Sequence, residues 1–172
     1  MLLNDYQAAA LRTANPKADK SLRLAVAGMG LAGEAAEVLE LVWLGGSDQN
    51  KLIKELGDQA WYCAETASIA GLALGDIPLP PKRAFGGMLS FAVQLSINAG
   101  EITDYLKKVV GHSHPMELER IQIGLGSVIR SVIDLAEYAG TDLETVCSRN
   151  VEKLMARYPT GFSTEGSVNR TE

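Results

Sequence analysis

Residues 22–70 contain two long stretches in which apolar residues recur every three or four positions, LRLAVAGMGLAGEAAEVLELVW (22–43) and SDQNKLIKELGDQAWYCAETASIA (47–70). This spacing places the apolar side chains on one face of a helix. Gly45 and Gly46 lie between the two stretches and suit a turn, because glycine readily adopts the left-handed conformation that ends many helices. The region therefore predicts two helices joined as an antiparallel hairpin.

The same spacing continues through the rest of the chain, and strict alternation of apolar and polar residues is almost absent, so an all-α fold is expected. Prolines mark several boundaries, because proline disfavours helix in the preceding residue and suits the first helical position. Ser47 or Asp48 should cap the third helix, and the residues from Thr141 to Glu144 form a capping box. Six helices are predicted, at about 5–14, 22–43, 48–70, 83–110, 115–139 and 141–157, the fifth opening at Pro115. A polar, frayed tail should follow from residue 163.

An internal repeat groups these helices. Residues 25–34 (AVAGMGLAGE) match residues 92–101 (AVQLSINAGE) at an offset of 67, and later positions match at an offset of 69. The two-residue difference falls in the loop between paired helices. We therefore predict a four-helix core made of two tandem, degenerate hairpins, at about 21–76 and 83–143, with short terminal helices. The whole forms a single all-α domain over residues 1–162, and residues 163–172 are the polar tail.

Composition limits the classes of function. A chain of 172 residues with 47% hydrophobic content can bury a core unaided. Cys63 and Cys147 lie in apolar stretches without a CxxC partner, which favours reduced thiols and a cytoplasmic location. The net charge of −5 and the lack of a Lys/Arg cluster disfavour polymeric nucleic acid as a partner. No targeting segment is evident, and no apolar run reaches the ~18 residues of a membrane span.

Two pairs of acids lie at similar distances from the predicted turn. Glu34 and Glu37 are three residues apart on one helix, and Glu55 and Asp58 have the same spacing on the next, so each pair shares a helix face. In an antiparallel hairpin the two pairs can face each other. Two like charges about 5 Å apart repel by roughly 3 kcal/mol at an effective dielectric constant of 20, so such a cluster needs cations or protons. Oxygen ligands alone suit Mg²⁺ or Mn²⁺, which could align a polyphosphate and activate a water.

A simpler interpretation is that the acids form a solvated helix face, which is the usual role of an ExxE pair. Small neighbours such as Gly33, Ala36 and Gly57 favour a ligand site instead, because they allow helices to approach closely. Glu40 and Glu65 extend the acidic face and are interpreted as lying outside the set of metal ligands.

The sequences GEAAE (33–37) and KELGD (54–58) resemble the ExxE and ExxD motifs of the MazG-like superfamily, which includes the dimeric dUTP pyrophosphatases. DYQ (5–7), NVEKL (150–154) and RYP (157–159) extend the resemblance to about half of the chain. It implies Mg²⁺-dependent hydrolysis of (deoxy)nucleoside triphosphates to monophosphate and pyrophosphate, in nucleotide-pool house-cleaning. It further implies a set of site residues: Glu34, Glu37, Glu55 and Asp58 bind the metal and act in catalysis, and Asn150, Lys153, Arg157 and Tyr158 contact the nucleotide. Trp61, one turn beyond Asp58, could line a base pocket.

The second hairpin departs from the simple members of that superfamily, which have one hairpin followed by the Asn/Lys helix. The positions that match Glu55 and Asp58 are Gly124 and Ser127, so the second hairpin is expected to be a degenerate copy without an equal metal cluster. This departure leaves open which base is preferred and which phosphorus is attacked. It also leaves open the oligomeric state, and a homodimer is one possibility.

Three features of the sequence suggest other interpretations. Residues 28–33 (GMGLAG) match the GxGxxG of dinucleotide-binding folds and follow a strand-like segment (22–27), but that fingerprint needs a second strand after its helix, and none is predicted here. His112 and His114 could bind a transition metal, although a solvated turn is the simpler interpretation. The rival from another class is a non-catalytic helical module that binds a partner and carries the acids only as surface.

Overall fold

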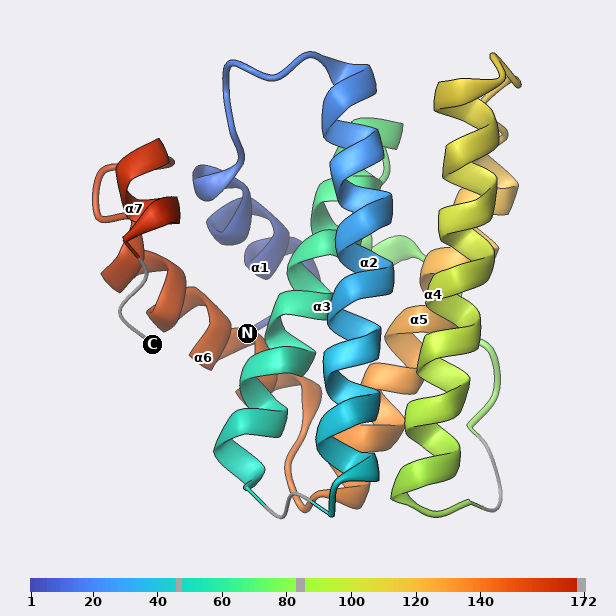
Figure 1. Ribbon diagram of the computed structural model, residues 1–172, viewed down its shortest axis with the longest axis vertical. Helices are drawn as coiled ribbons and strands as arrows, with labels where there is room; N and C mark the ends of the chain where they lie inside the picture. The colour runs from blue at the N-terminus through green and yellow to red at the C-terminus, as the bar shows by residue number, and fades with distance from the viewer. Residues whose placement is uncertain (46–47, 83–85, 170–172) are drawn as a thin grey trace.

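The computed structural model describes residues 1–45, 48–82 and 86–169, and all regular structure within these ranges is helical (Figure 1). The elements are, in chain order, α1 (Leu3–Ala10), η1 (Leu11–Thr13), α2 (Lys20–Trp43), α3 (Gln49–Ala70), η2 (Leu74–Asp76), α4 (Met88–Gly111), α5 (Leu118–Tyr138), α6 (Leu143–Arg157) and α7 (Thr164–Val168). The two η elements are single turns of 3₁₀ helix.

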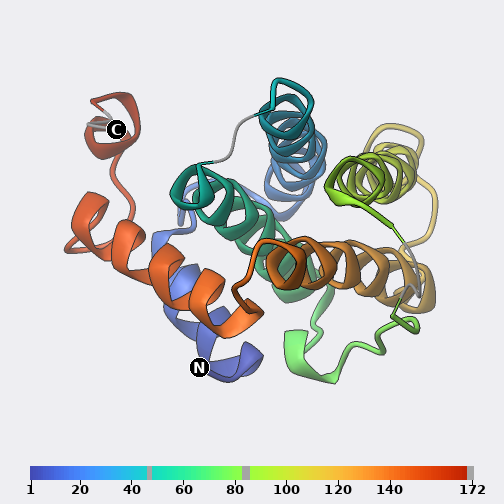
Figure 2. The same cartoon turned by 90° about the horizontal axis from the view of Figure 1, so that it is seen from below.

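Four long helices, α2 to α5, form the core. α2 packs against both α3 and α4, and α5 packs against both α3 and α4. The colours in Figure 1 show that α2 and α5 run in one direction and that α3 and α4 run in the other. In the view of Figure 2, α2 and α4 lie on one side of the core and α3 and α5 on the other. The predicted all-α fold with a four-helix core is therefore confirmed.

The two hairpins, α2–α3 and α4–α5, pack together through equivalent helices. Their first helices contact each other, and so do their second helices. Two hydrogen bonds join α4 to α2: Thr103 Oγ1 donates to the Gly28 carbonyl at 2.8 Å, and Ser96 Oγ donates to the Ala35 carbonyl at 3.2 Å. This is the arrangement expected of two related hairpins about an approximate twofold axis. That one hairpin derives from the other stays a prediction.

Helix α3 is covered on most of its sides, because α1 and α6 pack against it in addition to α2 and α5. Small residues make this close packing feasible. At Gly57 the approach is so close that an added Cβ would lie 2.8 Å from the Cβ of Asn150 in α6. Figure 2 shows α6 and α1 beside α3, on the side away from α4. The outer helices therefore position C-terminal residues next to the acids of α3.

In the N-terminal half of the chain, some helix ends differ from the predictions. The first helix is α-helical only to Ala10 and continues as 3₁₀ helix to Thr13. α2 begins two residues early, because the side chain of Asp19 accepts a hydrogen bond from the Leu22 amide. Asp48 caps α3, as predicted, whereas its alternative Ser47 lies outside the described residues.

The later helix ends also differ. α4 begins at Met88, and the predicted start at residue 83 lies outside the described residues. The prediction that Pro115 opens a helix is wrong: α5 begins at Leu118, because Tyr105 Oη donates to the Pro115 carbonyl and accepts from the Glu117 amide, which holds residues 115–117 as a loop.

At the sixth helix, Asp142 is the capping residue, one position after the predicted Thr141, and accepts from the Thr145 amide at 2.7 Å. The tail contains one short helix, α7, capped by Ser163.

Three further sequence expectations concern the cysteines, the GxGxxG segment and membrane crossing. Cys63 and Cys147 are buried and unpaired, as expected of core thiols, and burial raises the pKa of both. The GxGxxG segment, residues 28–33, lies inside α2, so it cannot form the strand-to-helix turn of a dinucleotide-binding fold. Among the described helices, none combines the length and the apolar character that a membrane crossing requires.

Candidate functional site

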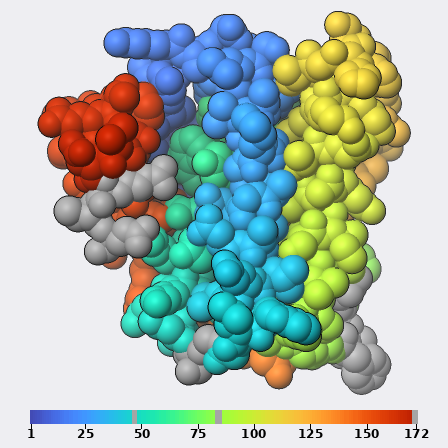
Figure 3. Space-filling view, in the orientation of Figure 1, coloured from blue at the N-terminus to red at the C-terminus, as the bar shows by residue number. Residues whose placement is uncertain are grey.

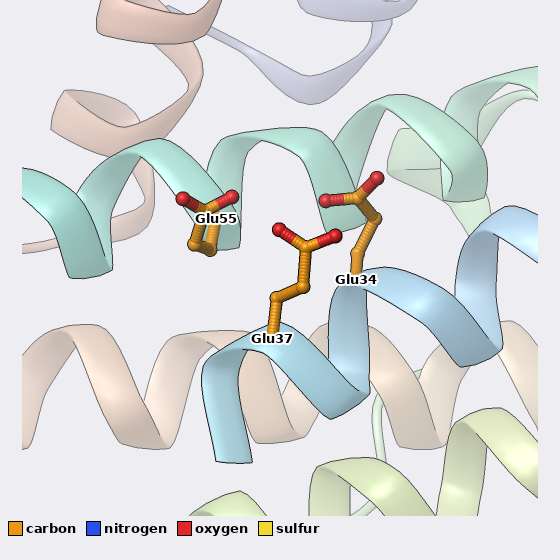
Figure 4. Close-up of side chains that lie close together, drawn as sticks. All are labelled: Glu34, Glu37 and Glu55. Carbon is orange, nitrogen blue, oxygen red and sulfur yellow. The ribbon is translucent and has the colours of Figure 1, made fainter. Parts of the chain in front are cut away.

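Three glutamates converge between the first two core helices. Glu34 and Glu37 project from α2 and Glu55 projects from α3, and each offers a carboxylate oxygen within 4.8 Å of the others (Figure 4). Glu34 and Glu55 are half-buried and Glu37 is exposed. In the part of the chain that the structure describes, this is the one group of three or more acidic, histidine or cysteine side chains whose ligand atoms converge in this way.

Burial and mutual repulsion both disfavour the charged forms of these glutamates. Burial is the largest cause that raises the pKa of Glu34, to about 7, and the charges of Asp58, Glu37 and Glu55 raise it further. Burial also raises the pKa of Glu55, and Asp58 is the next largest cause. A proton or a cation relieves this repulsion. The cluster is therefore a place where positive charge is favoured.

Asp58, the fourth predicted acid, does not belong to this converging group. Its Oδ1 accepts hydrogen bonds from Lys153 Nζ and, at 3.1 Å, from Asn150 Nδ2, and both donors lie on α6. Asp58 nevertheless lies close enough to act on Glu34 and Glu55 through its charge. The structure thus brings together three of the four predicted acids as potential ligands and places the fourth beside them in an ion pair.

The donor set fits a hard divalent cation. Three carboxylates from two helices provide only oxygen ligands, and Mg²⁺ and Mn²⁺ prefer such ligands while retaining water or substrate oxygens. The helices are also fixed in position by the packing of the core, which favours a preformed site. Glu34, Glu37 and Glu55 would hold the ion.

A pocket of about 340 Å³ adjoins the acids, a volume within the range of small-molecule sites. It lies between α2, α3, α6 and the segments that follow α1 and α6, and Figure 3 shows the surface recessed between α2, in blue, and the C-terminal segment, in red. Its lining residues are Thr13, Asn15, Ala18, Leu22, Arg23, Val26, Ala27, Glu34, Asp58, Trp61, Tyr62, Glu65, Leu154, Arg157, Tyr158, Phe162 and Ser167. Glu34 belongs to both the pocket and the acid cluster.

Aromatic side chains form much of the pocket wall. Trp61 is oriented by its indole N–H, which donates to Thr13 Oγ1 at 3.0 Å and to the Ala10 carbonyl at 3.2 Å. Tyr62 contacts Trp61 edge to face, with 5.0 Å between ring centroids. Tyr158 and Phe162 are stacked with centroids 5.9 Å apart. Flat apolar walls of this kind suit a planar ligand.

The predicted substrate-binding residues divide into two groups. Trp61, Arg157 and Tyr158 line the pocket. Asn150 and Lys153 are absent from its lining, and both are engaged by Asp58. Asn150 is almost completely buried and also accepts a hydrogen bond from the Tyr6 hydroxyl at 2.9 Å. These two residues therefore orient an acid, and their contact with a nucleotide stays a prediction.

Arg23 and Glu65 were missed as a pair by the sequence analysis. Glu65 lies outside the converging acids, as interpreted, but it is not solvated: the structure buries it in the pocket wall and joins it to Arg23 by two hydrogen bonds. A signal was available: the antiparallel register that sets α2 against α3 at the acids also brings Glu65 within about one turn of Arg23. Glu40 is exposed, as interpreted.

The second hairpin has no comparable arrangement at the matching positions. Gly124 and Ser127 offer no carboxylate. Asp104 is exposed and pairs with Lys107 and Lys108, and hydrogen bonds from these lysines lower its pKa to about 2.

Comparison with protein-family models, with curated proteins and with solved structures gives no match to this chain. The resemblance to the MazG-like superfamily therefore stays a prediction that rests on the motif residues.

Proposed function

We propose that the protein is a Mg²⁺-dependent hydrolase that converts nucleoside triphosphates, ribo or deoxy, to the monophosphate and pyrophosphate. The observation that supports this most is the shared position of Glu34, which belongs both to the three-glutamate cluster and to the wall of the aromatic pocket. A nucleotide has the matching polarity, with a planar base at one end and a polyanion at the other. The motif resemblance to the MazG-like superfamily points to the same reaction.

The acids and the basic residues have complementary tasks in this proposal. A divalent ion, when bound, supplies Lewis-acid charge for the phosphates and acidifies a water molecule. Glu34, Glu37 and Glu55 would hold that ion, and a carboxylate oxygen of these glutamates that does not ligate it would accept the proton of the attacking water. Arg157 lines the pocket and offers a cation to phosphate oxygens. Lys153 and Asn150 hold Asp58 in a fixed orientation beside the cluster.

The aromatic residues bind the other end of the substrate. Trp61, Tyr62, Tyr158 and Phe162 provide ring faces and edges on which a nucleobase can stack. Base–aromatic stacking contributes roughly 1–3 kcal/mol per base, which is enough to orient the nucleotide with its phosphates toward the acids.

The test is direct. The protein is incubated with each common ribo- and deoxyribonucleoside triphosphate, including dUTP, and Mg²⁺, and both pyrophosphate and monophosphate are quantified. Release of the two in equal amounts, and its loss on chelation of the metal, is the expected result. Glu55→Gln should abolish the release, whereas Glu40→Gln, which removes an exposed acid of α2 outside the cluster, should not. Absence of pyrophosphate from every nucleotide would refute the proposal and favour a non-catalytic role.

A further inference from the structure

A second pair of charged side chains lines the pocket away from the glutamates. Arg23 Nε donates to Glu65 Oε1 at 2.7 Å, and Arg23 Nη2 donates to Glu65 Oε2 at 2.8 Å. The Glu65 side chain is only 4% exposed, whereas that of Arg23 is 29% exposed. Glu65 is therefore enclosed behind Arg23, and the arginine presents the accessible part of the pair.

The pair lies at a distance from the acid cluster that suits a nucleoside. Along α2, Arg23 precedes Glu34 by eleven residues, which corresponds to about 16 Å at the rise of an α-helix. Along α3, Glu65 follows Asp58 by seven residues, or about 10 Å. All four residues line the same pocket. A nucleotide whose phosphates lie at the glutamates would thus extend its base toward Arg23.

The hydrogen bonds to Glu65 determine which part of the guanidinium remains for a ligand. Glu65 occupies the edge formed by Nε and Nη2. The other edge, formed by Nη1 and Nη2, carries two parallel N–H groups, and a guanidinium can only donate. Such a fork is complementary to two adjacent acceptors. Because Leu22, Val26 and Trp61 also line the pocket, a flat base suits this fork better than a second phosphate.

We propose that Arg23 recognises the edge of the nucleobase and that the pocket selects bases with two adjacent acceptors on one edge. Guanine and hypoxanthine have such an edge at O6 and N7, and cytosine has one at O2 and N3. In uracil and thymine an N–H lies between the two carbonyl groups. In adenine the amino group lies beside both N1 and N7. These three bases therefore direct a donor at the guanidinium donors, which is unfavourable.

Glu65 is a positioning residue in this inference, because it fixes the guanidinium through the edge that faces away from the base. The inference rests on the proposed function for the presence of a nucleotide, but the readout below does not depend on hydrolysis.

Binding of nucleoside monophosphates, which contain no bond that the proposed reaction cleaves, provides the test. Isothermal titration of the full chain with dGMP, dCMP, dUMP, dTMP and dAMP in the presence of Mg²⁺ should give tighter binding of dGMP and dCMP, by on the order of 10- to 100-fold for a lost bidentate contact. Comparison of the dGMP and dCMP titrations shows which of the two bases, guanine or cytosine, the pocket prefers.

Arg23→Lys keeps the charge that Glu65 needs but removes the fork, and it should abolish the selectivity. Glu65→Gln should lower the ratio of dGMP or dCMP affinity to dUMP affinity, a ratio that a purely structural pair would not change. Arg130→Lys is the matched control, because Arg130 pairs with the nearly buried Asp134 on α5 and does not line the pocket. It should leave the selectivity unchanged.

The outcomes separate this inference from the proposed function. Equal binding of all five monophosphates, preference for dUMP, dTMP or dAMP, or no binding of any of them would overturn the role of Arg23 whether or not the protein releases pyrophosphate. Selective binding without pyrophosphate release would support the base subsite and count against the hydrolase. The ranking of nucleotides by the unmodified protein decides the question even if a variant fails to fold.

Discussion

Lys153 Nζ, on α6, donates a hydrogen bond to Oδ1 of Asp58, on α3. The pair is only partly accessible, with side-chain exposures of 19% and 23%. One acid of the motif is therefore linked to a helix late in the chain, whereas the carboxylates of the three glutamates converge on one another. Lys153 also acts on the cluster, since its charge opposes the rise in the pKa values of Glu34 and Glu55. The four acids are consequently not equivalent.

This difference predicts different effects of two neutralising substitutions on stability. Glu55→Gln removes a negative charge from a repelling group, so the free energy of unfolding of the metal-free protein should stay equal or rise slightly. Asp58→Asn removes the partner of Lys153 and should cost about 1–3 kcal/mol of the free energy of unfolding. Urea denaturation in EDTA measures both. A stabilising Asp58→Asn would show that the ion pair contributes nothing to the fold.

The raised pKa of Glu34 predicts a pH dependence of the stability of the metal-free protein. Because the pKa is about 7 in the folded chain against an ordinary 4.5, the folded chain binds more protons than the unfolded chain between these values. The contribution of Glu34 to stability is therefore fully present below about pH 4.5 and is lost as the pH rises toward 7. Mg²⁺ competes with this proton, so its affinity should increase over the same range.

Thermal melting from pH 4.5 to 8 in EDTA, for the unmodified protein and for Glu34→Gln, isolates this contribution. The melting temperature of Glu34→Gln should fall less steeply with rising pH than that of the unmodified protein, because residue 34 no longer titrates. Parallel curves for the two proteins would mean that Glu34 titrates normally.

Substitution by alanine should have opposite effects on stability at two glycines of α2. A Cβ on Gly30 would lie 2.2 Å from the ring of Tyr62, whereas a Cβ on Gly33 would meet no atom within 4 Å. Gly30→Ala should therefore displace the Tyr62 ring from its contact with Trp61 and destabilise the protein by about 1–3 kcal/mol. Gly33→Ala should stabilise it by up to about 1 kcal/mol, because alanine favours helix. Equilibrium unfolding of both variants, with near-UV circular dichroism for the aromatic contact, checks the contrast; equal effects would contradict it.

The contacts of Asn150 predict strong coupling to Tyr6. Asn150 accepts from the completely buried Tyr6 hydroxyl and donates to Asp58, so Asn150→Ala leaves two polar groups without this partner and should cost about 1–3 kcal/mol. Tyr6→Phe removes one of these groups. In the double variant part of the cost should therefore disappear, which a double-mutant cycle detects by urea unfolding. Additive costs would show that the hydrogen bond between the two residues is unimportant.

Much of the fold could be predicted because the signals are local. The apolar spacing and the glycine turn specify α2 and α3, and the repeat indicates that a second hairpin should follow. Helix ends were less predictable where a distant residue decides them. Pro115 meets the local criteria for a helix start, but the hydroxyl of Tyr105, ten residues earlier, holds that segment as a loop.

The candidate site was predictable to the same extent. The spacing of Glu34, Glu37 and Glu55 on two antiparallel helices is sufficient to bring their carboxylates together. The partners of Asp58 could not be derived in this way, because they lie 92 and 95 residues later and reach it only through the packing of α6 on α3. Periodicity describes a helix face but does not say which distant helix covers it.

The packing of α6 on α3 has a consequence for the order of events during protein synthesis. At about 5–20 residues per second, a ribosome needs roughly 5–20 s to add the 95 residues that separate Asp58 from Lys153. The three glutamates leave the ribosome early and together, in one hairpin. Throughout that interval Asp58 lacks its partner Lys153, and Gly57 lacks the Asn150 side chain that packs against it in the folded chain. The nascent chain thus holds its acids for several seconds before the two side chains that secure one of them have been made.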